Sequence, residues 1–483
     1  PRAVALLAAA GCPVEGAHVR LPKGLVEHAL TLLPPRDSLS FLSFRYSAMP
    51  HAIGLRQGES HIGIVGNAYY IFDYAMGGAR DCVESDVDDK ELIVDNLTSY
   101  ELDVCNLIVA SSRSSSDGRG TANPYDDPEQ SRSYLERHVR GQRRRPFIHA
   151  RNHMCNPWML EERRLDALAQ MAVRGRDEVE RLLQEDKPLV WMNPISPLQY
   201  HGDEVADIID VAERHSPNCF VMVSPEVMFG ATGPVTLAGS LVQHNAEVLA
   251  ATVLTQLVKP GTPVIYGCVS GVMDLRKAEI SHGNLETPLF SAAAVQLADR
   301  YGMPSRVISG NTSARAPGVR ACTEASLGLY MALASGANII TTGLLDSTLM
   351  VSYEHLVVVD ELARQIRHTT RGLRVDEQTL AVDLIHAEGH PSPGFLSADH
   401  TLEFMKEEVY YSDFVGRCET SYEDWYQKAH ARVKEILAAA DSEPAGAQLV
   451  RERLEAIVAA LRSDNRTWRS DEKEWWVPYT RHL

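Results

Sequence analysis

Aromatic and polar side chains stand at the ends of several short apolar segments of this chain. The segments are Leu189–Asn193, Cys219–Val223, Val264–Gly267, Arg306–Ser309 and Asn338–Thr342. Residues at and just beyond these ends supply aromatic rings, amides, hydroxyls and a few carboxylates, with little fixed positive charge. Each aromatic face attracts an organic cation by about 0.5–2 kcal/mol, and a carboxylate can compensate the charge. If the ends meet in space, the sequence predicts a site for an organic cation.

Position at these ends suggests a role for each side chain. The expected aromatic cage consists of Trp191, Phe229, Tyr266 and Tyr353. The carboxylate that balances the charge is expected to be Glu226 or Asp346. The rest of the ligand, for which a carboxylate is one candidate, is expected to hydrogen-bond to Asn193, Asn311, Ser313 and His355. The residues expected to position the reacting group are Glu226, Tyr353 and His355, and no acid or base catalyst is identified.

Three of these residues also have an ordinary structural interpretation. Trp191 can be core, Asn193 can cap a turn before a proline, and Glu226 can be an acid at a helix start, where the dipole favours it. Their common location favours the site.

The elements that position these residues alternate regularly from about residue 146. A further strand is predicted at Phe147–Ala150, and helices are predicted at 159–185, 203–214, 234–257, 286–301, 321–335 and 349–370. Near-continuous apolar strands joined by helices indicate a parallel sheet. We predict an α/β fold, a TIM-type (β/α)8 barrel, in which chemistry lies in the loops after the strands. Two more strands are needed to close it, and Leu380–His386 and the N-terminal half are the candidates.

The sequence divides into three regions that differ in composition and in predicted secondary structure. Residues 1–140 are expected to form a mixed α/β extension packed on the barrel, and they contain the broken strand pattern His61–Tyr74. Residues 141–390 are the predicted barrel core. Residues 391–483 are predicted to form a helical cap or oligomerisation arm, with helices at 422–440 and 445–461 and an aromatic tail. Because exposed Trp clusters usually pack on something, we expect a homo-oligomer.

Composition excludes several classes of protein. The formal charge of −17 over 483 residues argues against nucleic acid or an anionic membrane as the main partner. The basic run 140–145 more plausibly pairs with local carboxylates. Eight cysteines without a CxxC pair indicate reduced thiols and a cytoplasmic protein. No membrane-spanning run or signal peptide is visible, and the chain opens within a helical pattern, so we expect an N-terminal segment to be missing.

The sequence GATGPVTLAG does not fit a nucleotide-binding fingerprint. Its glycines at 230, 233 and 239 lack the GxGxxG spacing, which argues against a dinucleotide. A flat ligand could still approach the backbone closely there. We therefore expect Gly230, Thr232 and Gly233 to contact a flat cofactor.

A second cluster has ligand types that zinc uses. His149, His153 and Cys155 are closely spaced, and zinc activates thiolates in some methyl-transfer enzymes. Such a cluster more often forms ordinary hydrogen bonds, and we expect no bound metal.

Several long blocks resemble one known family. They are NPISPLQY, MFGATGPVTLAGSLVQHNAEVLAATVLTQLVKPGTPVIYGCVSGVMD, ASLGLYMALASGANIITTGLLDSTLMVSYEHLVVVDE and FLSADHTLEFMKEE. Together they resemble the trimethylamine methyltransferase family, including its betaine-demethylating members. The resemblance implies a TIM-type barrel that transfers a methyl group from a small N-methylated amine to a Co(I) corrinoid (cobalamin). It also implies that a cognate partner protein carries this corrinoid.

The chain departs from the family in one loop. Members acting on trimethylamine carry pyrrolysine after the strand that matches Arg306–Ser309, whereas this chain has TSARAPGVR, with Ala316 or Pro317 near that position. The resemblance is therefore to the members without pyrrolysine, which act on quaternary amines such as glycine betaine. A quaternary substrate leaves as a neutral tertiary amine, so no residue need protonate the nitrogen. Two alternatives stay open: a zinc-dependent methyltransferase, and a noncatalytic betaine- or choline-binding protein.

Overall fold

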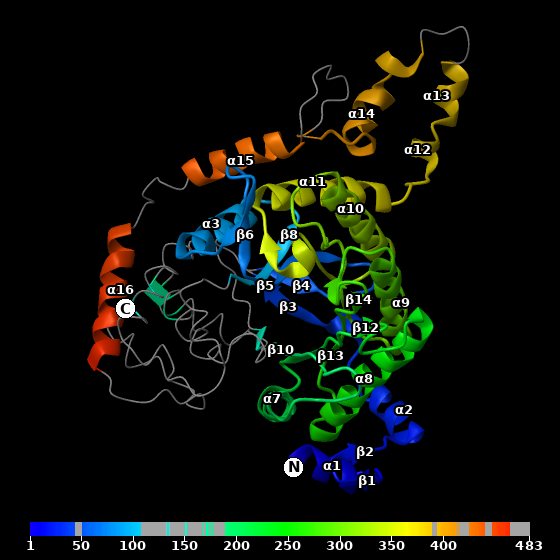
Figure 1. Cartoon of the computed structure of the whole chain (residues 1–483). Coiled ribbons are helices and arrows are strands. Elements are labelled where there is room, and N and C mark those ends of the chain that lie inside the picture. Colours follow the sequence, from blue (N-terminus) through cyan, green and yellow to red (C-terminus); the bar gives the residue numbers. More distant parts are fainter. Residues whose placement is uncertain are drawn as a thin grey trace.

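The structure is a computed structural model, in which a curled parallel sheet lies inside a layer of helices (Figure 1). It describes residues 1–43, 51–107, 189–388, 394–412, 414, 425–439 and 447–463, and a few residues between 132 and 177. The sheet has eight strands in the order β8-β5-β17-β16-β13-β11-β10-β9, and all its neighbouring pairs are parallel. In chain order they are β5 (His61–Ala68), β8 (Tyr100–Leu107), β9 (Ala150–Arg151), β10 (Leu189–Met192), β11 (Phe220–Val223), β13 (Val264–Cys268), β16 (Ser305–Ile308) and β17 (Ile339–Thr341).

The sheet turns back on itself. Its last strand in sequence, β17, pairs with its first, β5, with Ile339 opposite His61. Within the described residues, β8 and β9 form the two edges. Parallel strands in chain order, with the last beside the first, make the predicted TIM-type barrel, so the predicted fold class is confirmed.

Five predicted strands are confirmed to within one residue at each end, as β10, β11, β13, β16 and β17. The predicted strand at 147–150 meets β9 only at Ala150, and its other residues lie outside the described ones. The strand considered at Leu380–His386 is wrong, because helices α12 (Glu377–Leu380) and α13 (Val382–Ala387) occupy it. Val382 and Ile385 are 54% and 55% exposed, whereas both faces of a barrel strand are buried.

The two further strands that the barrel needs are β5 and β8, and both come from the N-terminal half, one of the two regions predicted to supply them. Strand β5 lies within the predicted strand pattern His61–Tyr74. The barrel sheet therefore includes part of the segment that was expected to be an extension. Gly63, Gly66 and Asn67 interrupt the apolar pattern of β5, which makes a buried strand hard to recognise there.

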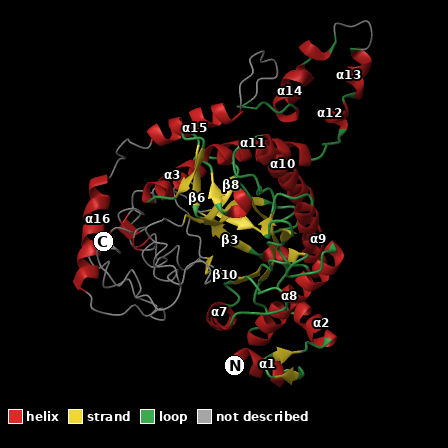
Figure 2. Cartoon of the chain, viewed as in Figure 1, coloured by secondary structure: helices red, strands yellow, loops and turns green. Residues whose placement is uncertain are grey.

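Helices cover the outer face of the sheet (Figure 2). They follow successive strands and are α7 (Gly202–His215), α8 (Leu237–Val258), α9 (Glu286–Tyr301), α10 (Val319–Ala334) and α11 (Tyr353–Thr370). Small residues such as Ala251, Ala294 and Ala325 are buried on these helices and let them approach the strands closely. The helices predicted in these five gaps are confirmed, while the one predicted at 159–185 falls largely outside the described residues.

An antiparallel hairpin fills the N-terminal end of the barrel. It consists of β3 (Ser40–Ser43) and β4 (His51–Gly54). Ile53 and Leu55 pack in one buried cluster with Phe220, Met222 and Ile265 from the strands. This end is therefore closed by apolar core, and polar chemistry is left to the opposite end. Ahead of the hairpin lie α1 (Arg2–Ala9), β1 (Val14–Glu15), β2 (His18–Val19), α2 (Lys23–Thr31) and the 3-10 turn η1 (Arg36–Ser38).

Short strands and turns surround the C-terminal end of the barrel, which we call the mouth. One small sheet contains β12 (Met228–Phe229), β14 (Gly271–Asp274) and β15 (Glu279–Ser281). Another contains β18 (Met350–Val351), β6 (Tyr70–Asp73) and β7 (Gly78–Asp81). The remaining elements there are α3 (Glu84–Asp95) and the turn η4 (Asp346–Thr348).

The C-terminal part is helical where it is described, as predicted. Its elements after α13 are η5 (Phe395–Ser397), α14 (Asp399–Glu408), α15 (Trp425–Ala439) and α16 (Ala447–Ser463). Helix α15 packs on α11 and α3 and buries Tyr426, Ala429 and Val433, whereas α12 to α14 project from the barrel (Figure 1). Among the described residues, no helix has the length and apolar content to cross a membrane.

Candidate functional site

The register of the sheet decides which side chains face the barrel interior. Trp191, Met222 and Ile265 lie side by side on neighbouring strands, and Arg306 lies between Gly267 and Ile339. Side chains alternate between the two faces of a strand. Trp191, Met222 and Ile265 belong to the interior cluster, so this row points inward.

Arg306 is a buried cation inside the barrel. The side chain is 2% exposed, and its guanidinium carbon lies 4.3 Å from the centre of the Trp191 ring. One nitrogen, Nη2, donates to Thr341 Oγ1 at 3.0 Å, but Nε and Nη1 are buried and have no hydrogen-bond partner in the described part of the chain. Burial lowers the pKa of Arg306 to about 9, and the nearby Cys268 and Glu226 oppose this shift. The guanidinium is therefore charged at neutral pH.

Trp191 connects this cation to the mouth. Its ring faces Arg306, and its Nε1–H donates to Asn193 Oδ1 at 2.8 Å. Asn193 is partly exposed at the end of β10, while Trp191 is 6% exposed. The structure thus brings together two residues that the sequence assigned to the site.

Glu226 lies just beyond β11 and is partly exposed. Burial raises the pKa of its carboxyl group, and the charge of Arg306 partly opposes that. The packing after the end of β11 is tight, because a Cβ on Gly267 would lie 1.9 Å from Ser224 Oγ. Arg306 thus has an indole against its guanidinium, an amide bonded to that indole, and a carboxyl group whose pKa its charge affects.

Two members of the expected aromatic cage face away from the interior. Tyr266 is fully buried against the helices, and its hydroxyl donates to Asn245 Oδ1 of α8 at 3.1 Å. Phe229 is 3% exposed and packs on Phe290 of α9, with ring centres 4.7 Å apart. Both lie in the layer between strands and helices, so neither ring faces the barrel interior as the predicted cage requires.

Tyr353 and His355 are also structural. Tyr353 Oη donates to Asp86 Oδ1 at 3.0 Å and thereby ties α11 to α3. His355 is fully buried between α11 and α15, and its Nδ1 lies 2.9 Å from Tyr426 Oη. Neither side chain faces the barrel interior, so neither can position a ligand there. Of the four expected cage aromatics, only Trp191 points inward.

The buried His355 predicts a loss of stability in acid. Burial lowers its pKa to about 3. An unfolded chain binds this proton near pH 6.5, so the stability present above that pH is lost as the pH falls toward 3. At pH 5.5 the loss is about 1.4 kcal/mol. We expect His355→Gln to show a correspondingly smaller decrease in unfolding free energy between pH 7 and 5.5, measured by urea titration.

His368→Gln is the matched control, because His368 lies on the same helix but is partly exposed. Its decrease should equal that of the wild type. Equal decreases in all three proteins would contradict the assignment of His355 as a buried neutral group.

The remaining predicted ligands brace loops. Asn311 Oδ1 accepts from Leu344 N at 2.8 Å and holds the loops after β16 and β17 together. Ser313 Oγ lies 2.6 Å from Ser281 Oγ, and Asp346 Oδ1 accepts from Arg315 Nε at 2.8 Å. These contacts already use the side chains that were expected to bind the ligand. They place the loops around the mouth.

The glycine-containing turn lies at the rim of the mouth, directly after β12. Gly230 has φ +89°, and its N–H donates to the carbonyl of Gly233 at 3.1 Å. Thr232 Oγ1 accepts from Met228 N at 2.9 Å and closes the turn. A Cβ on Gly230 would lie 3.6 Å from Leu275 and Val235, both of which are 68% exposed. The rim is therefore apolar here and has no bulky side chain at residue 230.

The described residues contain no group of three or more potential metal ligands. His149, His153 and Cys155 lie outside the described residues.

Comparison with known proteins identifies the family. The profile of the family described as Trimethylamine methyltransferase (MTTB) matches residues 150–464. The chain belongs to this family. The resemblance inferred from its sequence blocks is thereby confirmed, and the protein is a member of a methyltransferase family.

Two relatives illustrate the relationship. The glycine betaine methyltransferase of Desulfitobacterium hafniense (strain Y51) is 35% identical over 282 residues, which cover 56% of this chain and 57% of that protein. The trimethylamine methyltransferase MttB of Desulfitobacterium hafniense (strain DSM 10664 / DCB-2) is 34% identical over 303 residues, 60% of this chain and 57% of that protein. The matches thus span little more than half the length of these relatives. The solved Methanosarcina barkeri monomethylamine methyltransferase (MtmB) is 12% identical, with a TM-score of 0.44 and coverage of 88% of this chain and 82% of that one.

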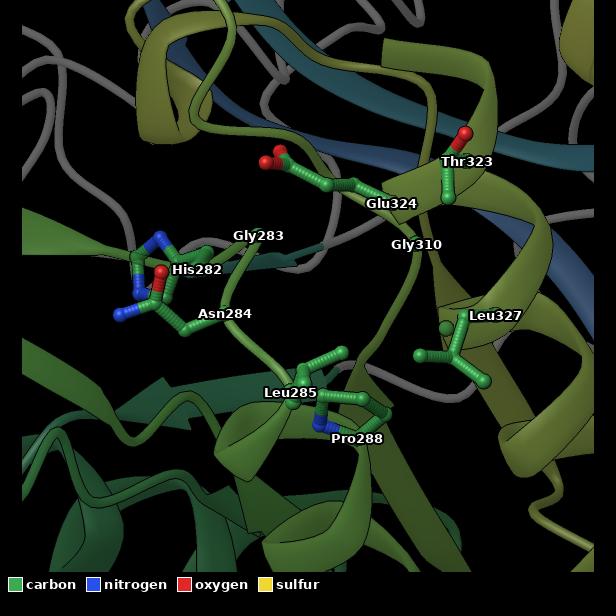
Figure 3. A pocket seen from close by; sticks show the side chains of 10 residues that line it. His282, Gly283, Asn284, Leu285, Pro288, Gly310, Thr323, Glu324 and Leu327 are labelled. Atoms are coloured by element: carbon green, nitrogen blue, oxygen red, sulfur yellow. The ribbon is translucent and has the colours of Figure 1, made fainter. Parts of the chain in front are cut away.

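A small pocket lies beside the mouth, between the loop before α9 and helix α10 (Figure 3). His282 and Glu324 stand in its wall. The carboxylate of Glu324 accepts from Thr312 Oγ1, from Ser313 N at 2.8 Å and from Arg320 Nε at 2.6 Å. Because Glu324 is fully engaged in bracing the loop after β16, we do not assign this pocket to the substrate.

Sequence reasoning missed two polar residues near the barrel interior, Arg306 and His282. His282 is 5% exposed, and burial lowers its pKa to about 4. The signal for Arg306 was present, since an arginine inside an otherwise apolar parallel strand must be buried or break the pattern. His282 follows a short hairpin that the strand pattern did not reveal, so no comparable signal existed for it.

Proposed function

We propose that this protein transfers a methyl group from a quaternary or tertiary N-methylated amine, such as glycine betaine, to the Co(I) corrinoid of a separate partner protein. Membership of the family supports the reaction class. The observation on the site that supports the proposal is that the Glu226 carboxylate, just beyond β11, interacts with the charge of Arg306, whose guanidinium lies against the Trp191 ring. A carboxylate beside an aromatic face is a suitable environment for an alkylammonium group.

The chemistry asks little of acid or base residues. When bound, the Co(I) corrinoid supplies the nucleophile. The methyl carbon leaves nitrogen, the electron pair of the broken C–N bond stays on nitrogen, and a quaternary substrate departs as a neutral tertiary amine. The chain's own residues therefore have to hold the cation, orient one N–CH3 bond toward the mouth and exclude water. Glu226 and Trp191 would hold the cation, and Asn193 would fix the plane of Trp191 through the hydrogen bond to its indole.

The rim of the mouth fits a flat, largely apolar ligand presented from outside. Gly230 leaves the backbone accessible, and the exposed side chains of Leu275 and Val235 flank it. We propose that the turn Gly230–Thr232–Gly233 receives the corrinoid face. The helical segment after residue 390 remains our candidate for an oligomerisation arm.

Single-turnover methyl transfer tests this function. The protein is mixed with glycine betaine and a Co(I) corrinoid protein, and methylation of cobalt is followed by its absorption while dimethylglycine is measured by mass spectrometry. We expect the two products in equal amounts, and neither when the corrinoid is left oxidised. Ligand binding without either product, across a panel of betaines and methylamines, would instead support a noncatalytic binding protein.

A further inference from the structure

The unsatisfied guanidinium of Arg306 is the one feature of the barrel interior that the proposed reaction does not explain. Methyl transfer from a quaternary nitrogen needs a site for a cation, yet the described interior places a second cation below it. In the described part of the chain no carboxylate pairs with Arg306, and two of its nitrogens lack any acceptor. Thr341 satisfies only a single N–H.

Leaving these donors buried and unpaired is costly. An unsatisfied buried donor costs about 1–3 kcal/mol, and more when the group is charged. Apolar residues of similar volume would stabilise such an interior better than a lone buried charge. A guanidinium kept in this state indicates that an anion satisfies it in the working complex.

The surroundings of Arg306 hold the guanidinium in place. The indole of Trp191 covers one face at 4.3 Å, and Asn193 fixes that indole from the mouth. Thr341 fixes one nitrogen from the next strand. A planar fork held in this way matches the two oxygens of a carboxylate, which it can bind through paired hydrogen bonds.

We propose that Arg306 binds the carboxylate of a zwitterionic N-methyl substrate, with the substrate's ammonium group held above it at Glu226. This assignment rests on the proposed function and narrows its substrate class to betaines that carry a carboxylate. Negative and positive groups of the substrate then face protein charges of opposite sign. The carboxylate lies inward and the N-methyl groups point toward the mouth, where the methyl acceptor is presented.

The same geometry disfavours substrates without a carboxylate. Choline carries the same trimethylammonium group but would leave the Arg306 donors unpaired. A site built to hydrogen-bond one substrate group discriminates strongly against an analogue that lacks it. We expect at least one of glycine betaine, proline betaine and carnitine to bind about 100-fold more tightly than choline, because its carboxylate accepts hydrogen bonds from a charged group that choline leaves unpaired.

Calorimetric titration without corrinoid tests the assignment. The wild type and Arg306→Gln are titrated with these three betaines and with choline. The substitution should weaken the preferred betaine about 100-fold and change choline by less than about 3-fold. Arg306→Lys keeps the charge but not the planar fork, so it should weaken the betaine about 10-fold.

Arg374→Gln is the matched control. Arg374 also lies over an aromatic ring, 6.0 Å from the centre of Phe404, but it is on the surface and already pairs with the carboxylate of Asp376. The Arg374→Gln variant should bind every ligand with the same affinity as the wild type. If Arg306→Gln does not fold, the affinities of Arg306→Lys and the preference of the wild type for betaines over choline still test the role of Arg306.

If choline binds to the wild type as tightly as every betaine, the proposed role of Arg306 is wrong. The proposed methyl transfer from an N-methyl cation would not be contradicted by that result. Absence of binding by all four ligands would overturn both proposals.

Discussion

Replacing Gly328 by alanine is expected to destabilise the barrel by about 3 kcal/mol, near the upper end of what overpacking costs. Gly328 is buried on α10, where the helix backbone touches the end of β16. An added Cβ would lie 2.2 Å from Gly310 N and 2.5 Å from its Cα. These are backbone atoms, so the helix or the strand end must move. Denaturation in urea should show a lower midpoint for the variant.

The control is Gly24→Ala on α2. Nothing lies within 4 Å of a Cβ at that residue, so only helix propensity changes. Alanine is favoured over glycine in a helix by about 1 kcal/mol. The same substitution should therefore stabilise at residue 24 and destabilise at residue 328. Stabilisation at both would mean that α10 does not approach β16 as closely as the structure has it.

The local pattern of the sequence was sufficient for the part of the barrel with strict alternation. Segments such as Leu189–Asn193 and Val264–Gly267 are short, apolar and followed by long helical patterns, and they become β10 and β13. The pattern indicated a broken strand at His61–Tyr74, which contains β5, but it did not assign that strand to the barrel, and it did not reveal β8, whose segment contains polar residues. Long-range pairing of β5 with β17, and of β8 with β5, supplies their place in the sheet, and a local pattern cannot report pairing partners.

The site was harder to predict because the position of a residue near a strand end does not determine whether its side chain faces the barrel interior or the helices. Trp191 and Tyr266 are both aromatic residues of barrel strands, yet register turns the first inward and the second toward α8. A shift of one residue reverses the face. The predicted acids and amides at loop ends were less constrained still, since Asn311 and Asp346 meet loop partners that no spacing reveals.

Glu226→Gln is expected to weaken binding of every N-methyl cation about 100-fold, or about 2.7 kcal/mol. A carboxylate and a cation 4 Å apart attract by about 4 kcal/mol at an effective dielectric constant of 20, and desolvation of the pair removes part of this. Calorimetric titration with choline and glycine betaine measures the loss. Glu279→Gln is the control, since Glu279 lies near the same mouth but its side chain is 51% exposed and pairs with Arg315. Solvent screening should keep that effect below about 3-fold.

The same substitution should make the unliganded protein more stable at neutral pH. Because burial raises the pKa of the Glu226 carboxyl, the folded protein holds this proton to a higher pH than the unfolded chain does. Stability present below the ordinary carboxyl pKa is therefore lost as the pH rises through the folded value. Glutamine carries no charge and avoids that loss, so urea midpoints at pH 7 should be higher for Glu226→Gln than for the wild type. Such opposite effects on stability and binding are typical of a charge retained for function.

The two charged residues of the mouth make distinguishable predictions. Glu226→Gln should weaken choline and the betaines alike, because both carry the ammonium group, whereas Arg306→Gln should weaken only ligands with a carboxylate. If Glu226→Gln weakened the binding only of ligands that carry a carboxylate, the substrate would have to bind in the opposite orientation. Unchanged choline affinity in the same variant would place the cation away from Glu226, even if methyl transfer itself were demonstrated.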